Sequence, residues 1–295
     1  MKPAHLAAAE PYLYLLPALL VIGAVLLLPL GLGLSYAFHD VNLLDPDSGS
    51  FVGLAHFRDI YVDAAFWGAL RNTLLWTSSS VVLQFLLGLV LALLLHQPFA
   101  GRRLVQVLVF LPWAVPSFLS GLDWAWLFNP VVGPLPHWFR ALGLMKTPEN
   151  LLSSPEHALI GPIVANVWWG VPFFAITLLA ALQSIPTDLY EAAGIDGAGP
   201  WVKFRRITLP FLAPTIAISV LLRTVWIANF ADLIVVMTKG GPADSTQILA
   251  SYIFTQAFQR LDFGYASALA AILLLLLLGY GVLLLAVRAV LTRRA

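Results

Sequence analysis

Six long apolar runs constrain this chain more than any other feature of its sequence. Crossing a bilayer core about 30 Å thick takes roughly 20 residues of helix. Inside lipid the backbone must satisfy its own hydrogen bonds, which an α-helix does within one segment. The predicted spans are Tyr12–Phe38, Ala69–Leu95, Leu104–Phe128, Ala158–Leu182, Pro210–Val236 and Tyr265–Val290. The predicted fold class is therefore all-α, a polytopic membrane protein with six transmembrane helices.

The composition is that of an integral membrane protein, and it excludes several kinds of functional site. Of the 295 residues, 60% are hydrophobic and 11% charged, whereas a soluble domain carries about 25% charged residues. The net charge of +1 does not indicate a nucleic acid partner. The sequence has no cysteine, which excludes disulfides and thiolate ligands, and its six histidines show no ligand spacing. No metal site and no catalytic residue are predicted.

The distribution of basic residues predicts the orientation. Lys and Arg are more frequent at the termini and in the loops after the second and fourth runs than in the other loops, with pairs at 102–103, 205–206 and 293–294. Basic residues favour the cytoplasmic side. Both termini and the loop 186–210 are therefore expected in the cytoplasm. The first run is longer than the apolar part of a signal peptide, so we expect it to be a retained helix.

The loop before the fifth run has the residues of two short helices joined by a hinge. Residues 191–210 read EAAGIDGAGPWVKFRRITLP. Asp188 and Glu191 have the spacing of a capping pair after Pro186, which predicts the start of a first helix. Glycines at 194, 197 and 199 allow a sharp turn, and Pro200 suits the first turn of a second helix. The alternative is a plain connector whose bases only fix the topology.

This loop resembles the "EAA" signature of the permease subunits of binding-protein-dependent ABC importers. The signature is Glu-Ala-Ala, three residues, Gly, nine residues and Ile-x-Leu-Pro, and the matching positions are Glu191, Ala192, Ala193, Gly197, Ile207, Leu209 and Pro210. Other stretches resemble the carbohydrate branch of that family, which includes maltose and glycerol-phosphate permeases. They are YLYLLPALL (12–20), FVGLAHF (51–57), FWGALRNT (66–73), MTKGGPADST (237–246) and DFGYASALA (262–270).

The resemblance implies a type I ABC importer permease-like fold and a defined assembly. Residues 1–295 would form a single transmembrane permease domain, with a core at about 65–290 and a coupling loop at about 186–210 that docks on a separate ATPase through the seven signature residues. The partners would be a second homologous permease, two ATPase subunits and an external solute-binding protein, in the inner membrane of a prokaryote. The chain has no G-x-x-x-x-G-K-[ST] phosphate loop, so we expect ATP and Mg on the ATPase and no cofactor on this chain.

The resemblance also implies where a solute would cross. The cavity-lining positions of sugar permeases map to Trp169, Gly170, Phe173, Leu222, Trp226 and Asn229. Arg223 joins them because an ionisable residue inside a span is a functional candidate by default. The alternatives are that the tryptophans only pack between helices and that Arg223 makes an interhelical pair.

The predicted function is the permease subunit of an ATP-driven importer for a sugar, either an oligosaccharide or a related polyol or glycerol-phosphate. An importer for an amino acid or peptide is the alternative within the same family. An ion-coupled secondary transporter is the alternative outside it. An intramembrane enzyme is disfavoured because the spans hold no cluster of catalytic residue types.

Overall fold

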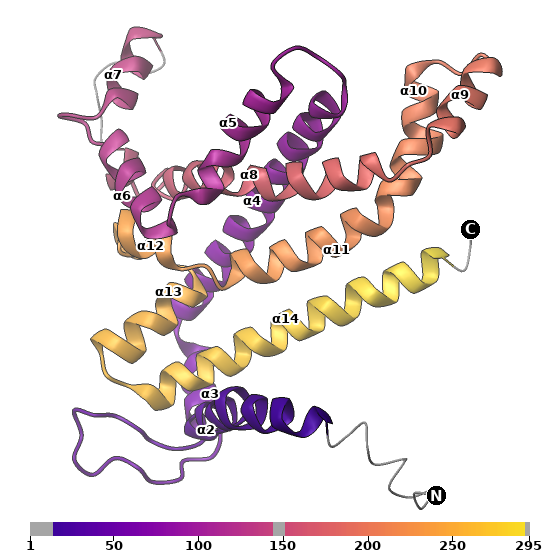
Figure 1. Cartoon of the computed structure of the whole chain (residues 1–295). Helices are drawn as coiled ribbons and strands as arrows, with labels where there is room; N and C mark the ends of the chain where they lie inside the picture. Colours follow the sequence, from indigo (N-terminus) through magenta and orange to yellow (C-terminus); the bar gives the residue numbers. More distant parts are fainter. Residues whose placement is uncertain (1–13, 144–150, 293–295) are drawn as a thin grey trace, which may run out of the picture. The chain divides into compact units, whose positions relative to one another are not determined.

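The computed structural model describes residues 14–143 and 151–292, and most of these are helical (Figure 1). Within those two ranges no β-strand forms, and only isolated bridges pair His39 with Phe51 and Asn42 with Asp262. Among the described residues, five helices are long and apolar enough to cross a membrane, and a bent pair supplies up to a sixth span. The predicted all-α fold is confirmed, while the side on which the termini lie stays a prediction.

Most of the predicted spans agree with the structure to within a few residues. The five spanning helices are Tyr14–Tyr36, Ala64–His96, Ile160–Gln183, Pro200–Met237 and Phe263–Ala286. The fifth begins ten residues before the predicted Pro210, because the helical residues of the preceding loop run into it without a gap. Apolar length therefore located the spans well.

The third predicted span, Leu104–Phe128, is wrong as a single helix. Helix α5 (Arg102–Ala114) and helix α6 (Ser117–Leu127) meet at an angle of 96°. Val115, the residue before Pro116, has extended dihedrals (φ −76°, ψ 127°). The proline ring disfavours helical geometry at the preceding residue and its nitrogen offers no donor, so the helix stops there.

The fifth predicted span is also interrupted. Helix α11 (Leu209–Ala228) ends before residues 229–231, and helix α12 (Asp232–Met237) follows. Asn229 donates from Nδ2 to the carbonyl of Val225 at 2.9 Å. Asparagine side chains compete in this way with helical backbone bonds. Asp232 suits the first turn of the new helix, where the macrodipole favours a negative charge.

The described chain divides into two compact units. Unit 1 comprises the residues up to Asp63 together with Ile253–Leu275, and unit 2 comprises Ala64–Tyr252 together with the residues from Leu276 onward. Unit 1 holds η1 (Gly23–Leu27), α2 (Leu28–Tyr36), α3 (Ala55–Val62), η4 (Thr255–Gln259) and the first part of α14 (Phe263–Thr292). Within it, Tyr265 donates from its hydroxyl to Asp63 Oδ2 at 2.7 Å. The single-domain assignment stays a prediction.

Unit 2 is built on three long helices, α4 (Ala64–His96), α8 (Ile160–Gln183) and α11. Helix α4 packs along α8, and α11 packs on both. A Cβ on Gly88 would meet Phe174 and the backbone beside it, so this glycine lets α4 and α8 approach closely. The shorter elements of the unit are α7 (Pro134–Ala141), η2 (Leu151–Ser153), α9 (Thr187–Ile195), α10 (Pro200–Lys203), η3 (Phe204–Thr208) and most of α13 (Leu249–Phe254).

Candidate functional site

A buried arginine lies where the three long helices of unit 2 meet. Arg223 on α11 has no exposed surface, and its Nε donates to Oε1 of Gln84 on α4 at 2.7 Å. Gln84 in turn donates from Nε2 to the carbonyl of Asn166 on α8 at 2.8 Å. These two bonds join all three helices. Since buried polar groups are costly unless hydrogen-bonded, this chain of bonds fixes the relative positions of α4, α8 and α11.

Three aromatic rings surround the guanidinium of Arg223. Its carbon lies 5.4 Å from the ring centre of Trp169, 5.6 Å from Phe173 and 5.2 Å from Trp226. Contacts of this kind stabilise a buried cation by about 0.5–2 kcal/mol each. Gly170 completes the enclosure, because a Cβ there would collide with Nη2 of Arg223 and with the side-chain amide of Gln84. We call these five residues around Arg223, including Gln84, the arginine cage.

The predicted solute-path residues divide into two groups. Trp169, Gly170 and Arg223 are buried, and Phe173 is half-buried. Leu222, Trp226 and Asn229 are exposed and recur at helical spacing, the first two on α11 and Asn229 at its C-terminal cap. Trp226 belongs to both groups, since it is 43% exposed and also touches the arginine cage. The structure therefore brings the seven residues together in unit 2, but only three of them present a surface.

At each of the two helix breaks a buried tryptophan donates to a backbone carbonyl. Trp169 Nε1 donates to the carbonyl of Val115 at the break between α5 and α6, at 2.9 Å. Trp76 Nε1 donates to the carbonyl of Ile227 at the end of α11, at 3.0 Å. Trp169 also stacks on Phe230, with ring centres 5.3 Å apart. Broken helices are tolerated in membranes only where the protein or a water-filled cavity satisfies the freed groups.

Gln84, Asn166 and Trp76 were missed by the sequence analysis. Gln84 and Asn166 are polar residues inside otherwise apolar runs, and both are fully buried. Polar residues at bilayer depth face the protein interior and mark functional positions. Applying that rule to uncharged side chains as well as to Arg223 would have found both. Nothing in the local sequence distinguishes Trp76 from an interfacial tryptophan.

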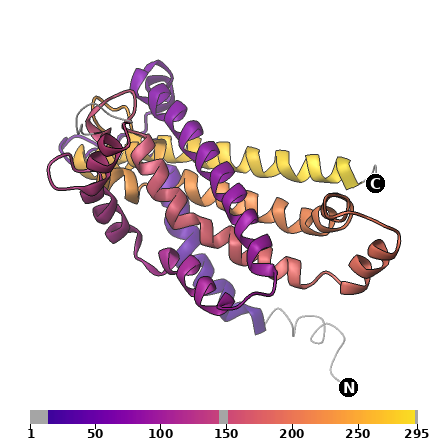
Figure 2. The ribbon, with the colours of Figure 1, turned by 90° about the horizontal axis from the view of Figure 1, so that it is seen from above.

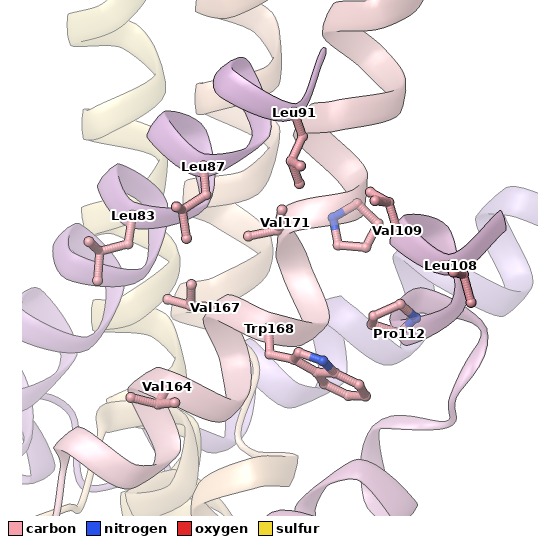
Figure 3. Close-up of a pocket in the computed structure, with 11 residues that line it drawn as sticks. Leu83, Leu87, Leu91, Leu108, Val109, Pro112, Val164, Val167, Trp168 and Val171 are labelled. Carbon is pink, nitrogen blue, oxygen red and sulfur yellow. The ribbon is translucent and has the colours of Figure 1, made fainter. Parts of the chain in front are cut away.

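A separate groove of about 450 Å³ lies among α4, α5 and α8, as Figure 3 shows. Its lining side chains are apolar: Leu83, Leu87, Leu91, Leu108, Val109, Pro112, Val164, Val167, Trp168, Val171 and Pro172. Sugar hydroxyls need polar partners, which a small number of well-placed groups supply in ordinary ligand sites. The indole N–H of Trp168 is the one polar side-chain group in this lining, so the groove suits hydrocarbon rather than a polar solute.

The loop 186–210 forms an elbow that projects beyond the ends of α8 and α11 (Figures 1 and 2). Helix α9 ends in a left-handed residue, Gly197 at φ +74°, and Ala198 N–H donates to the carbonyl of Ala193 at 2.8 Å. That bond is the mark of a Schellman turn, in which glycine fits the left-handed position. Helix α10 then begins at Pro200. The predicted pair of short helices with a glycine hinge is confirmed.

One detail of the elbow was predicted wrongly. Asp188 and Glu191 do not form a capping box, because the residue that caps α9 is Pro186, whose side chain makes no capping bond. Asp188 lies instead in the first turn of α9, where its charge favours the helix through the macrodipole. The elbow is held by another contact, in which the hydroxyls of Tyr190 and Thr208 are hydrogen-bonded at 2.9 Å.

The outer surface of the elbow carries the signature residues and several apolar side chains. Glu191, Ala192, Gly197, Leu209 and Pro210 are exposed, while Ala193 and Ile207 are half-buried. Ile195 is 88% exposed and Trp201 is 70% exposed. Trp201 stacks on Phe204, with ring centres 5.6 Å apart, and an exposed apolar patch of this kind favours a protein or membrane contact.

Comparison with known proteins decides the family. The model of the family described as "Binding-protein-dependent transport system inner membrane component" matches residues 84–295. This chain belongs to that family. The match contains the whole elbow, the arginine cage and both helix breaks.

Similar inner membrane components are known along nearly the whole length of the chain. A probable ABC transporter permease of Brucella suis is 36% identical over 273 residues, covering 92% of this chain and 94% of the relative. The trehalose/maltose transport system permease MalF of Thermococcus litoralis is 35% identical over 277 residues, covering 94% and 92%. A solved bacterial ABC transporter involved in import of the acidic polysaccharide alginate aligns with a TM-score of 0.79 at 26% identity, covering 95% and 96%. The predicted ABC importer permease fold is confirmed.

Proposed function

We propose that this inner membrane component is the permease subunit of an ATP-driven importer for a sugar. The observation that carries the proposal is the full-length similarity to a trehalose/maltose permease together with the similarity to the alginate importer. The arginine cage agrees with it, because sugar sites combine aromatic faces with a few polar groups. An amino acid or peptide solute is less well supported, since the two relatives above whose names state a solute are a trehalose/maltose permease and an alginate importer.

The elbow is the proposed coupling element. Glu191, Ala192, Ala193, Gly197, Ile207, Leu209 and Pro210 would dock on a separate ATPase subunit, with Mg and ATP bound there. The exposed apolar side chains Ile195 and Trp201 support this, because an unpartnered chain would hold them in water at a cost of free energy. The helical residues from Pro200 onward run directly into α11, so movement of the elbow would tilt the helix that carries Arg223.

The exposed stripe of Leu222, Trp226 and Asn229 is the proposed surface of the solute path. A second, homologous permease would face this stripe and close the path, and an external solute-binding protein would deliver the solute. Movement of the elbows by the ATPase would then open the path alternately to each side of the membrane. The proposed location is the inner membrane of a prokaryote.

A matched pair of glycine variants tests the docking. Gly197 and Gly143 both have left-handed backbones, at φ +74° and +72°, and a Cβ at either would meet open space. Gly197→Phe and Gly143→Phe therefore carry similar backbone strain, but only the first places bulk on the elbow. We expect Gly197→Phe to lose co-purification of the ATPase and ATP-driven uptake, while Gly143→Phe keeps both. Normal ATPase binding and uptake in Gly197→Phe would disprove the docking.

A reconstitution experiment separates the importer from a secondary transporter. Proteoliposomes that contain this chain without an ATPase should show no uptake when an ion gradient is imposed. The complete assembly should take up sugar when ATP is supplied. Gradient-driven uptake by the chain alone would favour ion coupling and contradict the proposed function.

A further inference from the structure

Arg223 keeps two hydrogen-bonding groups without a partner. Its Nε is bonded to Gln84, but Nη1 and Nη2 have no hydrogen-bond partner in the described part of the chain, although both are buried. Gln84 is a neutral amide and the three surrounding rings are uncharged. The positive charge of Arg223 is therefore held at bilayer depth without a counter-charge among the described residues of unit 2.

The two unbonded terminal nitrogens of Arg223 suit an anion as a ligand. Burying a charge without a counter-charge is costly, and such residues inside membranes mark functional positions. The two terminal nitrogens of a guanidinium form a planar fork that matches the two oxygens of a carboxylate. The cation–π contacts stabilise the charge without occupying those donors in hydrogen bonds.

The residues of the arginine cage differ in how firmly the surrounding structure holds them. Trp169 is fixed, since its Nε1 is bonded to Val115 and its ring is stacked on Phe230. The backbone at Gly170 lies against the guanidinium and does not move without α8. Trp226 is the exposed wall, with 43% of its surface accessible and its ring centre 5.2 Å from the guanidinium carbon. Trp226 therefore lies both next to the guanidinium of Arg223 and on the exposed surface that carries Leu222.

We propose that Arg223 and Trp226 form a subsite for the carboxylate of an acidic sugar. The sugar ring would stack on Trp226, and the carboxylate would bind Nη1 and Nη2 of Arg223 while Gln84 holds the guanidinium in place. The inference rests on the proposed function, because it assumes that the stripe on α11 lines the solute path. It assigns the solute to the uronic acids rather than to the neutral sugars.

The test is equilibrium binding to the complete assembly of permeases and ATPase, purified in detergent without nucleotide. The probes are labelled digalacturonate, its neutral dimethyl ester and the neutral disaccharides maltose and trehalose. We expect digalacturonate to bind at least about tenfold more tightly than its ester. Arg223→Gln should abolish this preference, Arg223→Lys should keep part of it, and Arg140→Gln, which changes an exposed arginine on α7, should keep all of it.

Each other outcome is decisive. Equal binding of the acid and the ester, or tighter binding of a neutral sugar, would overturn the carboxylate subsite and leave the sugar importer intact. Binding of none of the four probes would count against the proposed function itself. If Arg223→Gln fails to assemble with the second permease, Trp226→Ala decides instead. That variant keeps the charge and should still prefer the acid to the ester, and loss of the preference would overturn the subsite.

Discussion

The hydroxyl of Ser117 donates to Oδ2 of Asp232 at 2.6 Å, and this bond joins the two broken spans at the first residues of α6 and α12. The two short helices also pack on each other, and a Cβ on Gly121 would press on Val236. Trp169 contacts both breaks, through Val115 on one side and Phe230 on the other. The breaks in spans three and five therefore form one structural element, to which both helices contribute.

Removing the hydroxyl of Ser117 should loosen this element. A hydrogen bond of this kind contributes about 1 kcal/mol, which corresponds to roughly a fivefold change in a local opening equilibrium. Because the chain has no cysteine, Ala231→Cys introduces a single thiol beside the break. In the protein that carries this thiol, we expect Ser117→Ala to raise the rate at which a thiol reagent modifies position 231 by up to about fivefold. Ser184→Ala is the control, since Ser184 bonds only to a carbonyl of its own helix end, and equal rates in both variants would refute the coupling.

Gly170→Ala should destabilise the protein through the arginine cage. The added methyl group would collide with the ends of the Arg223 and Gln84 side chains, both of which are fully buried. Overpacking of this kind costs about 1–3 kcal/mol. We expect a lower Tm for the detergent-purified protein and loss of uptake. Gly68→Ala on α4 meets no atom within 4 Å and should leave Tm unchanged or raise it. An unchanged Tm in Gly170→Ala would show that the cage is looser than the structure indicates.

The side-chain amide of Asn72 should keep the loop that contains Lys239 from opening. Its Nδ2 lies 3.0 Å from the carbonyls of Ser245 and Gln247 and 3.4 Å from that of Asp244. Asn72→Asp replaces this donor with an acceptor that faces three carbonyl oxygens, so the loop should open more often. We expect trypsin to cleave after the exposed Lys239 about tenfold faster, as measured by mass spectrometry of the fragments.

Asn129→Asp is the matched control for that variant. Asn129 uses only its Oδ1, which accepts from the backbone N–H groups of Val131 and Val132. An aspartate keeps this acceptor, so cleavage after Lys239 should not change. Equal cleavage rates in the Asn72 and Asn129 variants would show that the Asn72 amide does not hold the loop.

Tyr190→Phe should weaken the elbow without altering the spans. The substitution removes the hydroxyl that bonds to Thr208, which leaves α9 and η3 joined mainly by the Gly197 turn. A lost hydrogen bond of about 1 kcal/mol would leave the elbow less well preorganised for binding. We therefore expect the affinity of the permease for the ATPase to fall by up to about fivefold, with little change in the Tm of the permease. Tyr14→Phe, at a tyrosine 78% exposed, is the control. Undiminished affinity in Tyr190→Phe would mean that the elbow is held elsewhere.

The sequence by itself determined the spans and the elbow. Apolar length is a property of one segment, so Ala64–His96 and Ile160–Gln183 lie close to their predicted ends. The elbow also follows from local chemistry, because Gly197 tolerates the left-handed backbone and Pro200 starts the next helix. A helix or a turn forms from bonds between residues a few positions apart, and the sequence displays those neighbours directly.

Only the tertiary structure decided which path residues are buried and which distant side chains bond to the helix breaks. Trp76 donates to the carbonyl of Ile227, and Arg223 donates to Gln84, across 151 and 139 positions of the chain respectively. Leu222 and Arg223 are adjacent in sequence, yet one is 55% exposed and the other is fully buried. Burial and the satisfaction of freed backbone groups depend on which distant segments pack together, and hydrophobic periodicity carries no record of those partners.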